Sequence, residues 1–298
     1  MVYFGESGRN PMVKKCIRTI LISMVLLVMI VPAAAAEAAA AMYPYSEQDI
    51  WCENEGQKIY GKAYIPQTGK AKLPLVIFSH ELCMTHASGD GYARAIAARG
   101  AAVYAFDYCG GSEQSKSDGR TTTMSVLTEV SDLEHVLAAA RQWSFVDPAQ
   151  IVLLGGSQGG LVASLTASRH ARELRGLILL YPAYIIPDEL HRHFASLEDV
   201  PDEVNYYGWV RLGRRYAEDA WNLDAYAGVE GFKKPVLIIH GDADTAVPLS
   251  YAEEAQRRYP DARLHIIHGA GHMFQDDKTF TEARDAILAY LRSIQLLP

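Results

Sequence analysis

The stretch "IVLLGGSQGGLVASL", residues 151 to 165, decides the fold class of this chain. Four apolar residues lead into Ser157, which stands between pairs of glycines and is followed by an apolar run of helical character. Gly155, Ser157 and Gly159 form a G-x-S-x-G pattern at a strand-to-helix turn, the setting of a nucleophile elbow. In so sharp a turn, side chains two residues before and after the serine would collide with backbone, so glycine is needed there. The pattern predicts that Ser157 is presented at the carboxyl end of a sheet, where open α/β folds bind ligands.

A dinucleotide-binding loop is the competing interpretation, because "GGSQGG" is glycine-rich and lies at the same turn. A G-x-G-x-x-G loop that starts at Gly155 requires glycine at position 157, where the backbone approaches the pyrophosphate closely. The chain has serine at this position, and no P-loop lysine follows. Nucleotide binding is therefore disfavoured.

Short β-rich runs alternate with longer helical patterns on both sides of this turn. Strands are expected at residues 58–65, 75–79, 102–106, 151–154, 176–180, 236–240 and 264–267. Helices are expected at residues 91–99, 126–143, 158–169, 249–258 and 281–294. The later strands are nearly continuous Val/Ile/Leu runs, as in strands covered on both faces. The pattern predicts an α/β fold with a mostly parallel sheet of about eight strands flanked by helices.

About fifty residues separate the strand ending at position 180 from the one beginning near position 235, which is too long for an ordinary connection. We expect an inserted segment at residues 183–232. It contains nine aromatic residues in 50 positions, or 18%, compared with 10% for the whole chain. They are Tyr184, Phe194, Tyr206, Tyr207, Trp209, Tyr216, Trp221, Tyr226 and Phe232. These rings suit either a cap over the substrate or the core of a small helical subdomain, and the sequence favours neither.

The first 36 residues have the layout of a secretory signal peptide. A basic segment at 14–18 precedes an apolar stretch at 20–31, and small residues suited to cleavage follow. The apolar stretch is shorter than the ~20 residues of a spanning helix, so cleavage is favoured over anchoring. We expect an exported protein, secreted, periplasmic or in the cell envelope, cleaved near Ala36. Residues 37–298 then form one α/β domain.

The charge of the chain argues against two kinds of partner. The full chain has a formal charge of −7. Cleavage removes four of its 28 basic and one of its 35 acidic residues, which leaves 24 and 34 and a formal charge of −10. Such a surface repels nucleic acid and anionic membranes, so neither is expected as a partner beyond the signal segment.

The cysteines and histidines give little indication of a disulfide framework or a metal site. Cys52, Cys83 and Cys109 follow the signal segment, without CxxC or zinc-type spacing. Three reduced, partly buried thiols are the simplest interpretation, and Cys83 with Cys109 is the expected pair if one bridge forms. His191 and His193 lie one residue apart but have no evident third ligand, so no metal is expected.

A serine hydroxyl becomes a good nucleophile only when a base takes its proton and a third group orients the base. "VLIIHGDADTAVP" (236–248) places Asp244 in the loop after one expected strand, and "LHIIHGAGHMF" (264–274) places His272 in the loop after the next. Loops that follow parallel strands emerge at one edge of the sheet. Ser157, Asp244 and His272 are therefore expected to converge, in the chain order serine, acid, histidine.

Other acids and histidines near these loops have simpler roles. Asp242 is an alternative acid, but it follows its strand so closely that we expect its side chain to brace the loop. His240, His265 and His268 lie on or beside strands, and we expect core or rim histidines there.

The segments "GGSQGG", "HGDADTAVP" and "GAGHMF", in this order, resemble the α/β-hydrolase superfamily over nearly all of the chain after the signal segment. Within it, the chain is similar to bacterial cinnamoyl and feruloyl esterases, which often carry an inserted cap here and segments like "FDYCGGSEQS" (106–115). The resemblance implies the α/β-hydrolase fold, serine esterase chemistry, and neither metal nor organic cofactor.

The resemblance also implies an oxyanion hole made by the backbone N–H groups of Gln158 and Leu82, the latter in "VIFSHELCMTH" (76–86). Glu81 departs from the family's common His-Gly-Phe-like turn, because it replaces the glycine. A carboxylate beside the developing oxyanion would oppose it, so we expect the Glu81 side chain to point away, or the oxyanion loop to be shifted by one residue. Loss of one donor costs about a hundred- to thousandfold in rate.

Three functions remain open at this level. The first is an exported carboxylesterase acting on a small-molecule or saccharide-linked ester, with hydroxycinnamoyl esters implied by the resemblance. The second is a serine peptidase or amidase of the same fold. A binding protein for a small ligand is the third, and it is disfavoured because all three triad candidates are present.

Overall fold

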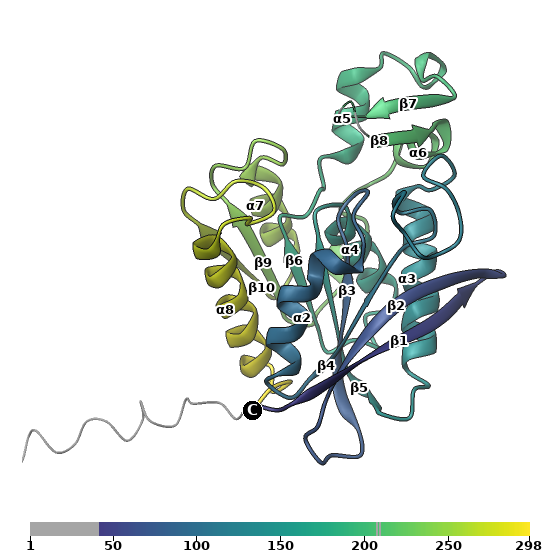
Figure 1. Cartoon of the computed structure of the whole chain (residues 1–298). Coiled ribbons are helices and arrows are strands. Elements are labelled where there is room, and N and C mark those ends of the chain that lie inside the picture. Colours follow the sequence, from purple (N-terminus) through teal and green to yellow (C-terminus); the bar gives the residue numbers. More distant parts are fainter. Residues whose placement is uncertain (1–41, 207, 209) are drawn as a thin grey trace, which may run out of the picture. The chain divides into compact units, whose positions relative to one another are not determined.

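The computed structural model describes residues 42–206, 208 and 210–298, so the expected signal peptide lies outside the described residues. The central sheet contains β1 (Tyr45–Asn54), β2 (Gln57–Pro66), β3 (Leu73–Ser79), β4 (Ala102–Phe106), β5 (Val146–Gly156), β6 (Gly176–Leu180), β9 (Val236–Gly241) and β10 (Ala262–Ile267). Its helices are α2 (Asp90–Ala97), α3 (Val126–Ala140), α4 (Gln158–Arg169), α7 (Leu249–Arg258) and α8 (Asp277–Ser293). Between β6 and β9 lie α5 (Ile186–His193), the hairpin β7 (Glu203–Tyr206) and β8 (Val210–Gly213), and α6 (Arg214–Ala220) (Figure 1).

The eight strands lie in the order β1-β2-β4-β3-β5-β6-β9-β10. All pairs from β4 to β10 are parallel, whereas β2 is antiparallel to both β1 and β4. This is the doubly covered, mostly parallel α/β sheet that the sequence predicts. In Figure 1 the cap elements α5, β7 and β8 lie beyond the carboxyl ends of the central strands.

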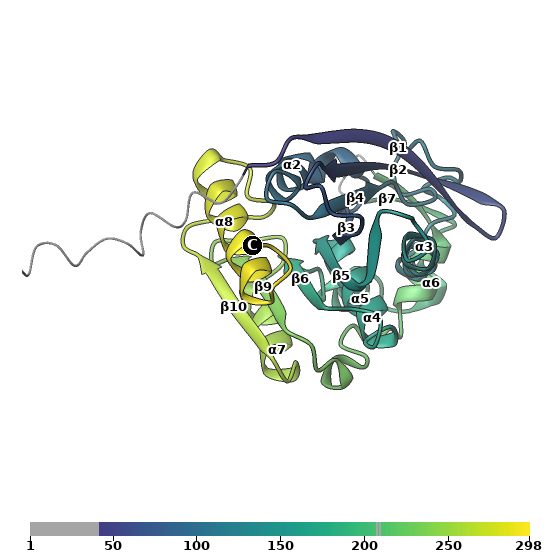
Figure 2. The ribbon, with the colours of Figure 1, turned by 90° about the horizontal axis from the view of Figure 1, so that it is seen from below.

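Alternate residues of the central strands enter two separate cores. Leu75 and Ile77 of β3 pack into the core beneath α3, α4 and α7, while Val76 and Phe78 pack into the core beneath α2 and α8. The same alternation holds in β5 and follows from the two-residue period of a strand. Helices therefore cover both faces of the sheet (Figure 2), and only the strand ends remain to form a site.

Strand β1 is not among the strands expected from the sequence, the first of which begins at residue 58. Its residues are mostly exposed or half-buried, because it is the outer strand of the sheet. A continuous ten-residue register with β2 determines its conformation. The strand could not be predicted from its polar sequence, because an edge strand needs little apolar surface.

The aromatic residues of the insertion lie in two different settings. Tyr184 and Phe232 are fully buried in the protein core. Tyr206, at the end of β7, and Tyr216, in α6, instead line a pocket beside Ser157. The β7–β8 hairpin that carries Tyr206 was not expected from the sequence.

All three cysteines of the described residues are free thiols, so the Cys83–Cys109 bridge is not formed. Burial raises the pKa of the Cys83 thiol to about 12. It also raises the pKa of Cys52, where the hydrogen bond with Tyr104 acts in the opposite direction. A protonated thiol is a weak nucleophile, which leaves Ser157 as the reactive group of interest.

Within the described part of the chain, no helix has the length and apolar character needed to span a bilayer.

Candidate active site

Ser157 occupies a strained turn between β5 and α4, with φ of 50° and ψ of −118°. This conformation is uncommon for a residue with a side chain, and strain of this kind is typical of functional sites. A Cβ atom on Gly155 would overlap the carbonyl of Gly159. A Cβ on Gly159 would in turn overlap the carbonyl oxygens of Ser79 and His80, at the end of β3. Both glycines are therefore required by close backbone approach, as the sequence predicts.

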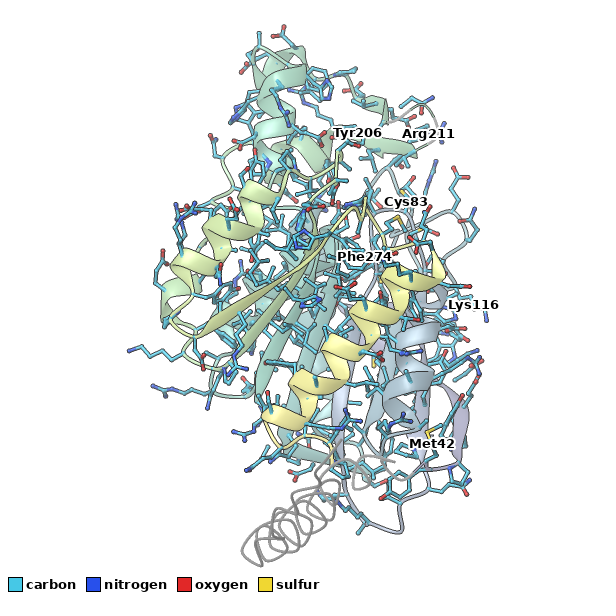
Figure 3. All side chains as sticks on the ribbon, turned by 90° about the vertical axis from the view of Figure 1, so that its left-hand side faces the viewer. Met42, Cys83, Lys116, Tyr206, Arg211 and Phe274 are labelled. Carbon is cyan, nitrogen blue, oxygen red and sulfur yellow. The ribbon has the colours of Figure 1, made fainter. Side chains whose placement is uncertain are left out.

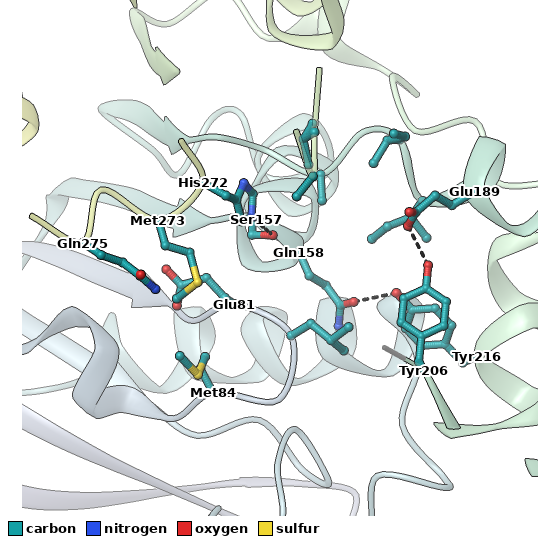
Figure 4. A pocket seen from close by; sticks show the side chains of 16 residues that line it. Glu81, Met84, Ser157, Gln158, Glu189, Tyr206, Tyr216, His272, Met273 and Gln275 are labelled. Atoms are coloured by element: carbon teal, nitrogen blue, oxygen red, sulfur yellow. Dashed lines mark hydrogen bonds between the residues drawn. The ribbon is translucent and has the colours of Figure 1, made fainter. Parts of the chain in front are cut away.

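The structure brings Ser157, His272 and Asp244 together from three separate loops. The hydroxyl of Ser157 lies 3.0 Å from Nε2 of His272 (Figure 4). Nδ1 of the same ring lies 2.7 Å from Oδ2 of Asp244. These loops follow β5, β9 and β10, which are parallel. In this geometry the imidazole can take the serine proton, while the carboxylate holds the opposite N–H and stabilises the imidazolium.

The Asp244 carboxylate is fully buried and strongly hydrogen-bonded. Its Oδ1 accepts the backbone N–H groups of Ala246 and Val247, each at 2.9 Å. Burial by itself would raise the pKa of Asp244, but hydrogen bonds from His240 and His272 outweigh burial and hold this pKa well below its usual range. Asp244 is therefore ionised, as an acceptor for His272 must be.

His240 also contacts the Asp244 carboxylate, and this contact was not expected from the sequence. Its buried Nε2 donates to the carbonyl of Val247 at 2.8 Å and lies 3.3 Å from Oδ2 of Asp244. The position of this histidine in β9, four residues before Asp244, is the signal that would have indicated the contact. Asp242 instead accepts from His268 at 2.8 Å and from a backbone N–H, and so braces its loop as expected.

Gln158 and Leu82, the two expected oxyanion donors, both line the pocket that contains Ser157. Gln158 is the first residue of α4. The N–H groups of a first helical turn lack partners within the helix and point toward its N-terminus, which favours negative charge. A developing oxyanion beside Ser157 is such a charge.

The Glu81 carboxylate is fixed by hydrogen bonds beside the site. Glu81 is buried but forms part of the pocket wall, and in Figure 4 it lies close to Ser157. Its carboxylate accepts the hydroxyl of Tyr181 at 2.9 Å and that of Ser88 at 2.7 Å. The Tyr181 ring also packs against His272, with 4.8 Å between ring centroids. Two hydroxyl donors thus hold the carboxylate in place, and a sequence pattern cannot reveal them.

His80 fixes the loop that carries Leu82. One nitrogen of its buried ring, Nδ1, donates to the carbonyl of Glu81 at 2.7 Å, and the other, Nε2, accepts from the N–H of Tyr108 at 3.2 Å. Burial lowers the pKa of His80, so the ring stays neutral and keeps Nε2 as an acceptor. The loop after β3 is therefore anchored on both sides of this ring.

The pocket has a volume of about 320 Å³ and lies between the strand ends and the cap. Its apolar wall includes Ile185 and Ile186 from the cap and Met273 beside His272. Within the inserted segment, the hydroxyl of Tyr206 donates to Oε2 of Glu189 at 2.5 Å (Figure 4). Figure 3 shows where Tyr206 of β7 and Phe274 of the loop after β10 lie in the molecule. A volume of this order is typical of small-molecule sites.

The remaining histidines of interest have other partners. His191 of α5 packs its ring against Trp221, and His265 lies 3.1 Å from the Glu282 carboxylate. Among the described residues, no group of three or more His, Cys, Asp or Glu side chains is placed to hold a metal ion.

The fold and the serine elbow define a serine hydrolase of the α/β-hydrolase class. A family model described as the prolyl oligopeptidase family matches residues 90–295, and the chain belongs to this family.

Solved structures and curated relatives agree with this class. Est1E from Butyrivibrio proteoclasticus, in a structure with ferulic acid bound, has a TM-score of 0.74 and 26% identity, covering 82% of this chain and 99% of that chain. The α/β hydrolase GrgF from Penicillium sp. sh18 shares the fold at 17% identity, with a TM-score of 0.67 and coverage of 85% of this chain and 98% of that one. Mouse serine hydrolase BPHL is 24% identical over 147 residues, which are 41% of this chain and 48% of BPHL. The chain thus spans about half the length of the curated relatives it matches.

Proposed function

We propose that this serine hydrolase is a carboxylesterase in which Ser157 is the nucleophile, His272 the general base and Asp244 the group that orients the base. The observation that carries the proposal is the unbroken chain from the Ser157 hydroxyl through His272 to Asp244, at 3.0 and 2.7 Å. His272 takes the serine proton as Oγ attacks the ester carbonyl, and then protonates the leaving alcohol. Water activated by the same histidine releases the acid from the acyl-enzyme.

The N–H groups of Leu82 and Gln158 would stabilise the oxyanion of both tetrahedral intermediates. Their positions in the pocket wall support this assignment. The proposed mechanism needs no group beyond the side chains and backbone donors of this chain.

Small acyl esters, including hydroxycinnamoyl esters of the feruloyl type, are the proposed substrates, with a small-molecule or saccharide alcohol. The pocket volume of about 320 Å³ and the aromatic walls from Tyr206 and Tyr216 support an aromatic acyl group. The similarity to Est1E, whose structure contains ferulic acid, supports it independently. In this proposal residues 183–232 act as the substrate cap of a domain formed by residues 37–298.

A peptidase or amidase is the second candidate, because the chain belongs to the prolyl oligopeptidase family. The same acyl-enzyme chemistry would then act on an amide. The difference lies in the leaving group, since an amine must be protonated before it can depart.

Turnover assays separate these candidates. The protein and its Ser157→Ala variant are incubated with methyl ferulate, short-chain p-nitrophenyl esters and aminoacyl amides. Ester hydrolysis that disappears in the variant is expected, whereas a preference for amides supports the peptidase and binding without turnover contradicts both. Ser168→Ala is the matched control, because Ser168 lies on the same helix and its hydroxyl bonds only to the Ser164 carbonyl in the described structure.

We also propose that the protein is exported, on the basis of the sequence of residues 1–36 alone. Expression of the full chain in a bacterial host, followed by N-terminal sequencing of the periplasmic fraction, should give a chain that begins near residue 37. A cytoplasmic product with an intact N-terminus would contradict export.

A further inference from the structure

The side chain of Gln158 is held at both ends of its amide. The hydroxyl of Tyr216 donates to Oε1 of Gln158 at 2.7 Å (Figure 4). Nε2 of Gln158 donates to Oε2 of Glu129 at 2.8 Å. Tyr216 belongs to α6 of the cap, whereas Glu129 belongs to α3 beneath the sheet edge. The Gln158 side chain is therefore hydrogen-bonded to both α6 and α3, which are far apart in the sequence.

Glu129 is wholly buried, and among the described residues no cation lies beside it. Its Oε1 atom has no hydrogen-bond partner in the described part of the chain. Asp132 on the same helix acts on Glu129, and Glu129 in turn acts on the Cys83 thiol of the loop after β3 and the Tyr108 hydroxyl of the loop after β4. None of these can carry a positive charge.

The protonation state of Glu129 follows from this environment. Burial raises its pKa well above the usual range, Asp132 raises it further, and the hydrogen bond from Gln158 offsets only part of the increase. A neutral carboxylic acid at neutral pH still offers its carbonyl oxygen to Nε2 of Gln158. In the observed arrangement the acid carbonyl accepts from Nε2 and the tyrosine hydroxyl donates to Oε1, so both ends of the amide are hydrogen-bonded.

We infer that Glu129 and Tyr216 are positioning residues of the oxyanion hole, because they clamp the Gln158 side chain from the core and from the cap and so hold its backbone N–H in place. This inference rests on the proposed function, in which that N–H stabilises the oxyanion. Docking of the cap and alignment of the hole are then a single event.

The strain of the elbow explains why such a clamp is needed. Ser157, directly before Gln158, has φ of 50°, and relaxation of this turn would rotate the following N–H. Hydrogen bonds weaken steeply as their angle departs from linear. The anchored side chain, only 1% exposed, opposes this rotation.

The test uses three variants and p-nitrophenyl acetate, whose small acyl group avoids most of the cap. Tyr216→Phe removes the donor, Glu129→Met removes the acceptor at similar size, and Glu129→Gln keeps a neutral acceptor. We expect kcat to fall about tenfold in the first two with KM within about twofold, and to remain at the wild-type level in Glu129→Gln. The inhibition constant of an acetyl-type trifluoromethyl ketone, which forms a tetrahedral oxyanion on the serine, should rise in parallel with the loss of kcat.

Tyr184→Phe is the matched control, since it removes another buried tyrosine hydroxyl that bonds to the same helix, at Ser164. It should retain full kcat. Wild-type kcat and inhibitor affinity in Tyr216→Phe, or an equal loss in Tyr184→Phe, would overturn the inference while leaving the esterase function intact. If Glu129→Met fails to fold, Tyr216→Phe and Glu129→Gln decide the matter. A wild-type protein without ester turnover would instead count against the proposed function.

Discussion

The buried imidazole of His240 lies 3.3 Å from the carboxylate of Asp244, which is also hydrogen-bonded to His272. Two histidines thus share one acid, one inside the core and one facing Ser157. His240 also donates to the carbonyl of Val247, so it fixes the backbone of the loop as well as its acid. We infer that His240 positions the Asp244 carboxylate from the side of the protein core.

Replacing His240 tests this role. His240→Leu removes the donor and leaves a buried carbonyl unsatisfied, which costs about 1–3 kcal/mol. We expect kcat for p-nitrophenyl butyrate to fall about tenfold with little change in KM, while His240→Gln, which retains an N–H near the same place, keeps most of the activity. Steady-state kinetics of both variants give the answer, and equal activity in the leucine variant would rule out the positioning role.

Asp244→Asn should preserve the fold but remove the charge that stabilises the His272 imidazolium. We expect kcat to fall by about 10⁴, with a much smaller effect on KM. The neighbouring variant Asp242→Asn is the control, because Asp242 pairs with His268 instead. Comparable losses in the two variants would mean that the acid has been assigned wrongly.

Glu129 makes stability depend on pH with a defined sign. The pKa of Glu129 is raised in the folded state, whereas in the unfolded chain it is about 4.3. Between these two pKa values the native protein holds one proton more than the unfolded chain. The free energy of unfolding then decreases by up to about 1.4 kcal/mol per pH unit as pH rises through this window. The loss begins above the unfolded pKa.

The Glu129→Gln variant should lack this dependence. Urea unfolding of the two proteins at pH 5, 6, 7 and 8 should show the variant gaining stability relative to the wild type as pH rises. Parallel curves would show that Glu129 has an ordinary pKa.

The carboxylate of Glu81 in the pocket wall should select against anionic acyl groups. We expect p-nitrophenyl hemisuccinate to be hydrolysed more slowly than the butyrate. In Glu81→Gln the amide oxygen can accept from one of the two hydroxyls and the amide N–H can donate to the oxygen of the other. This variant should raise the hemisuccinate-to-butyrate ratio of kcat/KM about fivefold, or about 1 kcal/mol. An unchanged ratio would place the charge too far from the acyl group to matter.

Gly159→Ala should be strongly destabilising, since its Cβ would overlap the carbonyl oxygens of Ser79 and His80. Overpacking against backbone of this kind costs about 3 kcal/mol, or roughly 6–12 °C in Tm. Gly231→Ala is the control, because a Cβ there meets nothing within 4 Å. Thermal melting followed by circular dichroism compares the two variants, and similar Tm values would contradict the close approach at the elbow.

Sequence periodicity alone was enough to predict the bounds of several strands and helices of the fold. The expected strands at 102–106 and 176–180 and the expected helices at 158–169 and 249–258 have the observed bounds of β4, β6, α4 and α7. Each is an apolar run or an amphipathic pattern ended by loop residues, and such signals are local. Strand β1 was not predicted because its polar sequence forms a strand only through pairing with β2. Strands β7 and β8 were not predicted because each has only four residues and depends on pairing with the other.

The convergence of Ser157, Asp244 and His272 was also within reach of the sequence, because loops that follow parallel strands emerge at one edge of a sheet. The contacts around them were not. Glu81 meets the hydroxyl of Tyr181 one hundred residues away, and Gln158 meets Glu129 across 29 residues. Topology places a loop at an edge, but a hydrogen bond requires two atoms within about 3 Å, and only the packing of helices and cap against the sheet determines that distance.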